Sequence, residues 1–477
     1  MSGRKGRRHL ARTHDCRERR HEGPLYVCKS VLSPGRRRRL PNAAGGRRGV
    51  QAMLRLARVQ TATLQGVPEV AARQGQAEKV AQIAFFATAL FAAQLYLSPA
   101  QWFPVLEPVH LAAILSAVGL SALLVRRVLS NQPLWMGWRA AVFAVYAVTS
   151  LLSPMWSIAP EGSTLGAIEV VKHFLFFLAL VNAVDTPRRV RIALGMYALA
   201  ALAPGWGTFN NWMHDELLVE GFRGRWLGVM ADPNHDAMAL VGALPILLFF
   251  CVGHAHKWPL RLVAAVGAVG CVAGIIATHS RGGTLGLAVA VILFALLSRR
   301  KAIATVCVLI GAAGMLLLAP TSFWQRNETA TLGAEDLSIV GRLEAWQVAG
   351  RIFEERPILG VGEGAFLDAW NQYAPIDSDR LFGHRYVAHN LILEVLGTLG
   401  LVGLFGLLGL LLVSIWSAWK ARNGELGGEA RAVLAAMIGN LVCQMFAGSA
   451  ASWFLFALCG FATCCEVWAK RGQPGSV

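Results

Sequence analysis

Charged residues are scarce in this sequence. Only 15% of its 477 residues are Asp, Glu, Lys or Arg and 55% are apolar, whereas an average soluble domain has about 25% charged residues. By length alone the chain would form roughly two to four soluble domains. Such domains could not bury this much apolar surface, so the composition excludes a water-soluble protein and predicts that most of the chain lies in lipid.

Metal-ligand and disulfide patterns are also missing. The nine cysteines show no Cys-x-x-Cys spacing and stand mainly in or beside apolar runs, which favours buried free thiols. Asp232 and Asp236 flank His235 without the fixed ligand spacing of a metal site, and no Asp-x-Asp pair stands out between the apolar runs. We therefore expect no metal site, no disulfide framework and no cofactor.

The net charge of +17 arises mainly in the N-terminal segment. Residues 1–60 contain 17 basic and three acidic residues, and residues 1–79 are expected to form a basic, disordered cytoplasmic tail. Such a tail could touch anionic lipid. It could also bind nucleic acid, but no aromatic residues interleave its charges, and we expect no nucleic-acid partner. We favour a third interpretation, in which translation begins at Met53 and residues 1–52 are not made.

The apolar residues form twelve segments close to the length of a membrane-spanning helix, about 20 residues for a hydrocarbon core of about 30 Å. No internal repeat of fixed period is visible, which argues against a solenoid or a two-halves transporter. The predicted fold is an all-α integral membrane protein with about 12 transmembrane helices. Nine lie in residues 80–319 and three in 390–470, separated by a large extramembrane loop at 320–389. The segments are 80–98, 106–125, 139–153, 163–183, 191–207, 236–253, 261–279, 283–298, 302–319, 391–417, 432–447 and 452–469.

The positions of Lys and Arg predict that both termini are cytoplasmic. In that orientation the inside loops hold 16 basic residues, and the short outside loops 99–104, 154–162 and 448–451 hold none. The outside basic residues are nine arginines in loops 208–235 and 320–389 and in the turn at Arg281. A guanidinium offers a planar fork of donors suited to phosphate. Pairing with local acidic residues is the alternative for any one of them, although the short turn at Arg281 has no acidic residue.

Loop 320–389 is expected to contain a helix that opens at Gly341 and ends before Pro357. The spacing of its larger apolar residues predicts one face that lies against the membrane or the bundle, with Arg342 pointing into a cavity. That predicted face comprises Leu343, Trp346, Gly350 and Phe353. The following string Gly360–Gly364 lacks the strand and helix of a phosphate-binding loop, so a tight turn is predicted.

His389 stands at the start of a long apolar helix. The positive end of the helix dipole favours its neutral form, near an unperturbed pKa of about 6.5, and this suits a general base at the membrane surface. A structural role is the alternative, and His384 is an equally isolated histidine. In loop 208–235, Asp232 to Asp236 reads as a turn and helix cap, with Asn234 or Asp236 holding free backbone N–H groups.

One predicted membrane helix carries Glu169, Lys172 and His173. Ionisable residues are expensive in a membrane, and these are three and four residues apart, so they can neutralise one another. A structural ion pair and a set of cavity-lining groups both fit the pattern.

Several motifs between residues 225 and 405 together resemble the bacterial O-antigen ligase family. His389-Asn390, followed after nine residues by Gly400-Leu401-Val402-Gly403, is similar to its His-Asn-x9-Gly-x-x-Gly signature. The other matching elements are Ser280-Arg281-Gly282, Arg342 with the turn Pro357–Gly362, and Arg225 with Pro233-Asn234.

This resemblance implies a metal-independent, inverting glycosyltransferase of the GT-C membrane class. Such an enzyme moves a preassembled glycan from undecaprenyl diphosphate to lipid A–core at the periplasmic face of the bacterial inner membrane, in lipopolysaccharide biosynthesis. The implied base is His389. The implied diphosphate-binding residues are Arg281, Arg225 and Arg342, with Arg223 as a lesser candidate, and Asn390 and Asn234 support them.

The resemblance leaves three other functions open. An O-antigen polymerase or a protein O-oligosaccharyltransferase shares the fold and differs in the acceptor. A lipid-linked glycan transporter would place charged residues along a midplane path in several helices. Here the embedded charge is concentrated in one helix, so transferase chemistry is favoured.

Overall fold

The computed structural model describes residues 46–253, 256–328, 337–374, 385–447 and 452–468. Within these ranges the chain is helical, and no strand occurs beyond one isolated bridge between Val219 and Arg223. The chain divides into two units, residues 1–67 and 68–477. Every contact discussed below lies within the second unit.

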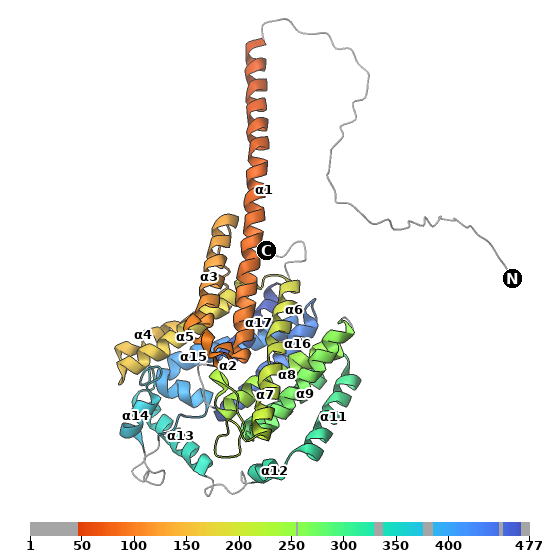
Figure 1. Cartoon of the computed structure of the whole chain (residues 1–477). Helices are drawn as coiled ribbons and strands as arrows, with labels where there is room; N and C mark the ends of the chain where they lie inside the picture. Colours follow the sequence, from red (N-terminus) through yellow and green to blue (C-terminus); the bar gives the residue numbers. More distant parts are fainter. Residues whose placement is uncertain (1–45, 254–255, 329–336, 375–384, 448–451, 469–477) are drawn as a thin grey trace, which may run out of the picture. The chain divides into compact units, whose positions relative to one another are not determined.

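Figure 1 shows the helices in chain order. Short 3-10 segments are η1 (Pro104–Val109), η2 (Ser153–Met155) and η3 (Gly228–Met230). The α-helices are α1 (Gly46–Leu97), α2 (Pro99–Trp102), α3 (Leu111–Ser130), α4 (Trp138–Leu152), α5 (Pro160–Ala183), α6 (Pro187–Ala200), α7 (Leu202–Met213), α8 (Pro233–Val252), α9 (Trp258–Ala277), α10 (Arg281–Leu297), α11 (Lys301–Leu318), α12 (Thr321–Glu328), α13 (Leu337–Glu355), α14 (Phe366–Tyr373), α15 (Leu391–Ala421), α16 (Gly427–Ala447) and α17 (Trp453–Val467).

Eight helices in the described ranges are long and apolar enough to cross a membrane. Shorter apolar helices lie at Arg281–Leu297, Lys301–Ala313 and Trp453–Val467. Each of the twelve predicted segments falls on helix, so the all-α integral membrane fold is confirmed. The segment predicted at 191–207 covers two helices, α6 and α7, that meet at Ala201. The number of twelve spans stays a prediction.

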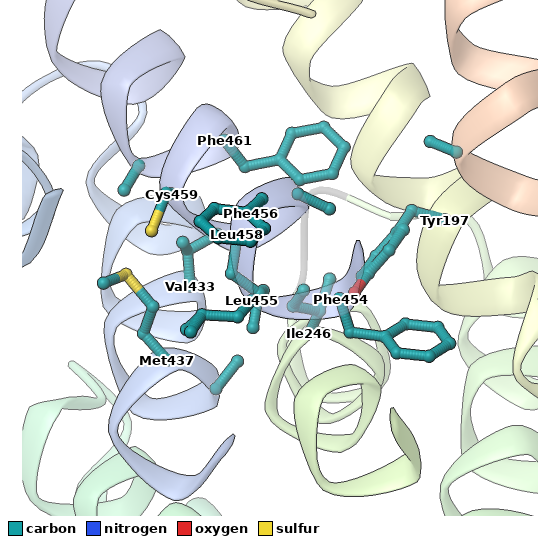
Figure 2. Packing of buried hydrophobic residues seen from close by; sticks show 14 of the residues in the cluster. Tyr197, Ile246, Val433, Met437, Phe454, Leu455, Phe456, Leu458, Cys459 and Phe461 are labelled. Atoms are coloured by element: carbon teal, nitrogen blue, oxygen red, sulfur yellow. The ribbon is translucent and has the colours of Figure 1, made fainter. Parts of the chain in front are cut away.

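A buried apolar cluster forms where α8, α16 and α17 meet α6 (Figure 2). Phe456 and Phe461 of α17 are fully buried in it together with Met437 of α16. Helix α8 contacts α6, α9, α10 and α16 and is 78% buried. It therefore needs no polar face. Glycines let α10 approach α16 closely, since a Cβ at Gly286 would lie 2.8 Å from the Gly439 carbonyl oxygen.

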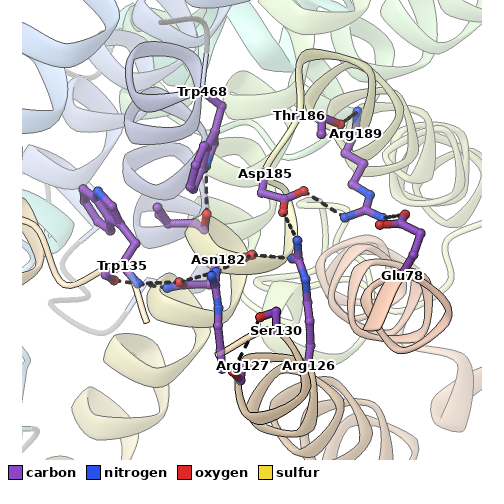
Figure 3. Close-up of polar contacts among 11 residues, drawn as sticks. Glu78, Arg126, Arg127, Ser130, Trp135, Asn182, Asp185, Thr186, Arg189 and Trp468 are labelled. Atoms are coloured by element: carbon purple, nitrogen blue, oxygen red, sulfur yellow. Dashed lines mark hydrogen bonds and ion pairs between the residues drawn. The ribbon is translucent and has the colours of Figure 1, made fainter. Parts of the chain in front are cut away.

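Basic residues near the C-terminal ends of α3 and α5 pair with acidic residues of neighbouring segments (Figure 3). Asp185 binds Arg126 at 2.6 Å and Arg189 at 2.8 Å, and Arg189 also binds Glu78 at 2.8 Å. Asn182 accepts hydrogen bonds from α3 and from the linker that follows it. These contacts join α1, α3, α5 and α6 at the end of the bundle that the charge distribution assigns to the cytoplasm, an orientation that stays a prediction.

A break inside α15 shapes the loop that precedes it. Gly400 has φ 61° and ψ −158°, which interrupts the helix. The Gly397 carbonyl accepts a hydrogen bond from the Val361 N–H at 3.0 Å. The Thr398 carbonyl accepts one from the Gly362 N–H at 2.8 Å. A Cβ at Gly400 would lie 2.4 Å from the backbone carbonyl of Ile358, in the turn that precedes the Gly-rich string. Glycine also takes this φ without strain. The Gly-rich string is thus a tight turn, as predicted, packed onto the break in α15.

The face of α13 that packs against other helices is not its predicted apolar face. The helix ends at Glu355, before Pro357 as expected, but it begins at Leu337, four residues before Gly341. Leu343, placed from the sequence on a face toward the membrane or the bundle, is 47% exposed and so does not pack against the bundle. Small residues let the opposite side of α13 approach α14 and α15 closely, and this decides which face is covered. The buried face consists of Ala345, Val348, Ala349 and Ile352.

The cysteine prediction holds for the part of the chain that the structure describes. All seven described cysteines are free thiols, and five of them are buried.

Candidate functional site

His389 lies directly before α15, with its side chain against the end of α16. Its Nδ1 is 3.1 Å from the Ala447 carbonyl oxygen. A carbonyl can only accept, so Nδ1 carries the proton and Nε2 keeps its lone pair. The backbone φ of 48° is a left-handed conformation that few non-glycine residues adopt. The ring is therefore held in one orientation and one tautomer by its neighbours.

The electrostatic surroundings keep His389 neutral. Burial lowers the pKa of His389, and the nearby charges of Arg342 and His235 lower it further, although the Ala447 hydrogen bond and Asp232 act in the opposite direction. The direction agrees with the neutral form expected from the sequence, but burial is the leading cause. At neutral pH the imidazole is thus a proton acceptor.

Two neighbours fix the backbone around His389. The Asn390 side chain accepts hydrogen bonds from the backbone N–H groups of Ile392 at 3.0 Å and Leu393 at 3.1 Å, so Asn390 is the N-cap of α15. On the other side, Trp346 Nε1 donates to the Ala388 carbonyl at 2.9 Å. Because Arg342 lies one turn before Trp346, it shares the face of α13 that meets the 388–389 segment.

Arg281 is the first residue of α10, in a turn held on both sides. Ser280 caps the helix by accepting from the Gly283 N–H at 3.1 Å. A Cβ at Gly282 would lie 2.8 Å from Phe446 Cβ, and one at Gly283 would lie 2.5 Å from Ala237 Cβ. The two glycines therefore let the start of α10 press against α16 and α8. This places Arg281 near the end of α16 that contacts His389.

Asn234 joins the arginine loop to the Ser280 turn. Its Oδ1 accepts from Arg223 at 2.8 Å and from Ser280 Oγ at 2.9 Å. The capping role expected of Asn234 or Asp236 belongs to Asp232, whose carboxylate accepts from the Asn234 and His235 N–H groups. Asp236 is instead buried and bonded to Thr208. The sequence did not separate them because Asp and Asn cap helices about equally well.

The two arginines of the loop have different surroundings. Arg223 is 5% exposed, and its three guanidinium nitrogens donate to Thr278, Glu220 and Asn234. Arg225 is half-buried and donates only to backbone carbonyls, those of Leu217 at 3.2 Å and Ala231 at 3.0 Å. The carbonyl contacts of Arg225 do not neutralise its charge. Arg223 instead connects the loop to α8 and to the turn before α10.

The structure thus brings most of the predicted residues to one end of the bundle, where α8, α10 and α15 begin and α16 ends. We call this the site end. His389 lies within electrostatic reach of Arg342, Asp232 and His235, and Asn234 connects the same stretch to Ser280, beside Arg281. Arg351 and Arg356 of the large loop instead donate to backbone carbonyls elsewhere. His384 lies outside the described residues.

Sequence reasoning did not predict the contacts that Ser280 and Trp346 make in this arrangement. The sequence contained a signal for Ser280, because serine is a common capping residue directly before a helix. Trp346 had none, since its partner carbonyl is 42 residues away. Among the described residues, no group of three or more His, Cys, Asp or Glu could hold a metal ion.

The predicted ionisable trio of α5 separates into two faces. Lys172 Nζ lies 2.6 Å from Glu169 Oε1, which is the ion pair expected from the sequence. His173 is fully buried and packs against Trp453 and Phe456, with ring centroids 4.1 and 4.8 Å away. The histidine therefore belongs to the core, and the ion pair lies on the exposed side.

Glu363, in the Gly-rich turn, is a buried carboxyl group that sequence reasoning did not single out. It is 6% exposed, and its Cγ would lie 3.0 Å from a Cβ at Gly166 of α5. Burial and the neighbouring Glu394 carboxylate raise the pKa of Glu363 from 4.5 to about 8. Its side chain is therefore protonated at neutral pH.

Glu363→Gln should flatten the pH dependence of stability. Because the pKa of Glu363 is raised to about 8 in the folded state, the folded protein binds this proton more tightly than the unfolded chain. The resulting contribution to stability is full below pH 4.5 and is lost as the pH rises to about 8. Gln cannot lose a proton, so the variant should equal the wild type at pH 5 and exceed its melting temperature at pH 8.5. Thermal unfolding in detergent between those values measures this. An unchanged wild-type slope in the variant would contradict it.

Residues 266–408 match the family model described as O-antigen ligase. No curated protein matches the chain. The matched segment runs from inside α9 to inside α15 and contains Arg281, Arg342 and His389, whereas the arginine loop precedes it. The match therefore covers part of the predicted site region and not the whole chain. The chain is a multi-pass membrane protein in which residues 266–408 are similar to the O-antigen ligase family.

Proposed function

We propose that this protein is an O-antigen ligase. It transfers a preassembled glycan from undecaprenyl diphosphate to lipid A–core at the periplasmic face of the bacterial inner membrane. The observation that carries the proposal is the state of His389, a neutral imidazole with Nε2 as acceptor, within electrostatic reach of Arg342 at the end of the bundle where Arg281 begins α10. A proton acceptor beside guanidinium groups suits attack by a hydroxyl group on a sugar that leaves a diphosphate.

In this reaction His389 Nε2 takes the proton of the acceptor hydroxyl as its oxygen attacks the anomeric carbon. The bond from that carbon to the diphosphate oxygen breaks, and its electron pair goes to the leaving diphosphate, so the configuration inverts. Arg281, Arg342 and Arg225 stabilise the charge that develops on the diphosphate. Arg223 and Asn234 act by holding the loop and the Ser280 turn together.

An O-antigen polymerase or a protein O-oligosaccharyltransferase would use the same residues with another acceptor. A lipid-linked glycan transporter is less favoured. In the described ranges, Glu169–Lys172 and Arg139–Glu466 are ion pairs within the predicted spans, and both are neutralised, whereas Arg342 lies near His389 at the site end.

The test is a transfer assay in purified membranes that contain EDTA. Lipid A–core and an undecaprenyl-diphosphate-linked glycan are supplied, and the products are separated by gel electrophoresis. We expect the wild type to produce a ladder of glycan-modified lipid A. Elongation of the donor glycan without modified lipid A would show a polymerase, and no product of either kind with intact donor would contradict the proposal.

A further inference from the structure

A cavity of about 890 Å³ lies between α1, α3 and α5. Its walls are largely apolar and include Phe91 and Leu95 of α1, Leu115 and Leu120 of α3, and Phe176 of α5. A pocket of this size and lining suits an apolar ligand that is held by burial rather than by hydrogen bonds.

Helix α3 makes this cavity open to lipid. The span Pro104–Ser130 is only 11% buried, whereas Ala72–Leu97 of α1 is 61% buried. One stripe of α3, which includes Ala113 and Gly119, lines the cavity, and Ala117 on the same helix does not. A lipid chain can therefore enter beside α3 without crossing the packed core of the bundle.

The polar end of the cavity lies beside the arginine loop. Ser98 and Gln101 line it, together with Gly228 and Val229 of the loop. A Cβ at Gly228 would lie 2.4 Å from Ser98 Oγ, so the loop backbone touches the end of α1 directly. Gly228 follows Arg225 by three residues. Arg225 Nη1 donates to the Ala231 carbonyl at 3.0 Å, and the Ala231 N–H donates to the Gly228 carbonyl at 3.1 Å. These two hydrogen bonds place the guanidinium that the proposed function assigns to the diphosphate near the Gly228 end of the cavity.

The Lys172–Glu169 pair fits this arrangement. Lys172 lines the cavity and is neutralised by Glu169 at 2.6 Å. The next residue, His173, contacts Trp453 at the beginning of α17. The ammonium group of Lys172 is therefore paired, so the cavity does not contain an isolated lysine charge.

We propose that this cavity, which we call the α1/α3/α5 groove, holds the isoprenoid chain of the lipid-linked glycan donor. The chain lies along the apolar walls, and the diphosphate end leaves at Gly228 and Val229 toward Arg225. This inference rests on the proposed function for the identity of the ligand, while the groove itself follows from the packing.

The first test compares two donors with the same glycan, one on a long and one on a short isoprenoid chain. Ala113→Phe adds a bulky ring to the lining of the groove. Ala117→Phe makes the same change one turn further along α3, at a residue that does not line the groove, so it is the matched control. We expect Ala113→Phe to raise the KM for the long-chain donor about tenfold. The KM for the short-chain donor and both values of Ala117→Phe should match the wild type. An equal effect on both donors, or no effect on either, would overturn the inference.

A second test needs no transfer activity. A polyprenyl diphosphate with a diazirine in its isoprenoid chain is added to the protein in lipid nanodiscs, and the labelled peptides are identified after irradiation. We expect label on α1, α3 and α5, reduced by Ala113→Phe but not by Ala117→Phe, and displaced by unlabelled polyprenyl diphosphate. Equal displacement by phosphatidylglycerol would show an ordinary lipid groove and overturn the inference. Specific labelling in a protein that transfers no glycan would overturn the proposed function alone.

Discussion

His389→Asn should abolish glycan transfer while leaving the protein folded. Asn is among the few residues that tolerate the left-handed φ of His389, and its amide can still donate to the Ala447 carbonyl. It cannot accept a proton at neutral pH, so we expect a loss of about 10²- to 10⁴-fold in turnover, which is typical for a general base. The measurement is the rate of lipid A–core modification in membranes, with thermal unfolding as the control for folding.

Two further measurements sharpen this prediction. The lowered pKa of His389 keeps the base neutral as the pH falls, so wild-type transfer should persist below the ordinary histidine pKa of about 6.5. His384→Ala is the comparison that the sequence calls for, because sequence alone did not distinguish the two histidines. Equal losses in His384→Ala and His389→Asn would remove the case for His389 as the base.

Arg342→Ala should lower transfer about 10²- to 10³-fold, the usual effect of removing one donor that stabilises developing charge. Arg281→Ala should have a similar effect, and Arg342→Lys should recover only part of the rate because an ammonium lacks the planar fork. The effect should fall mainly on kcat, since the diphosphate gains charge as the sugar bond breaks. Turnover of the donor at saturating acceptor measures it.

Arg351→Ala is the matched control for Arg342→Ala. The two arginines are nine positions apart on α13, about half a turn out of phase, and Arg351 donates to the carbonyls of Tyr373 and Ala374. We expect its loss to affect stability rather than transfer. A loss of transfer in Arg351→Ala as large as in Arg342→Ala would show that the arginine acts by holding α13 in place and not on the diphosphate.

Some of the site could be predicted from the sequence because its residues follow local rules. Asn390 stands directly before a long apolar run, where a capping residue is expected, and it caps α15. The glycines after Arg281 and in the 360–364 turn mark close approaches of backbone, and each has a neighbouring atom where a Cβ would be. The His-Asn and Ser-Arg-Gly motifs were visible for the same reason, since each is a contiguous cap or turn.

Other parts depended on contacts between distant segments. The face of α13 was predicted from the size of its apolar residues, but the alanines that permit a close approach to α14 and α15 decided it. The role of Asn234 as a bridge between Arg223 and Ser280 depended on segments up to 46 residues apart. No periodicity within one segment carries that information.

The sequence by itself determined that this is an all-α membrane protein, because apolar runs of spanning length and scarce charge are properties of the chain alone. It also determined which motifs resemble the O-antigen ligase family. Only the tertiary structure decided that Ala447 fixes the tautomer of His389, that Arg342 lies within its electrostatic reach, and that a groove between α1, α3 and α5 opens beside the arginine loop. The physical reason is that hydrogen bonds, pKa shifts and cavities arise between helices far apart in sequence, and packing alone sets their distances.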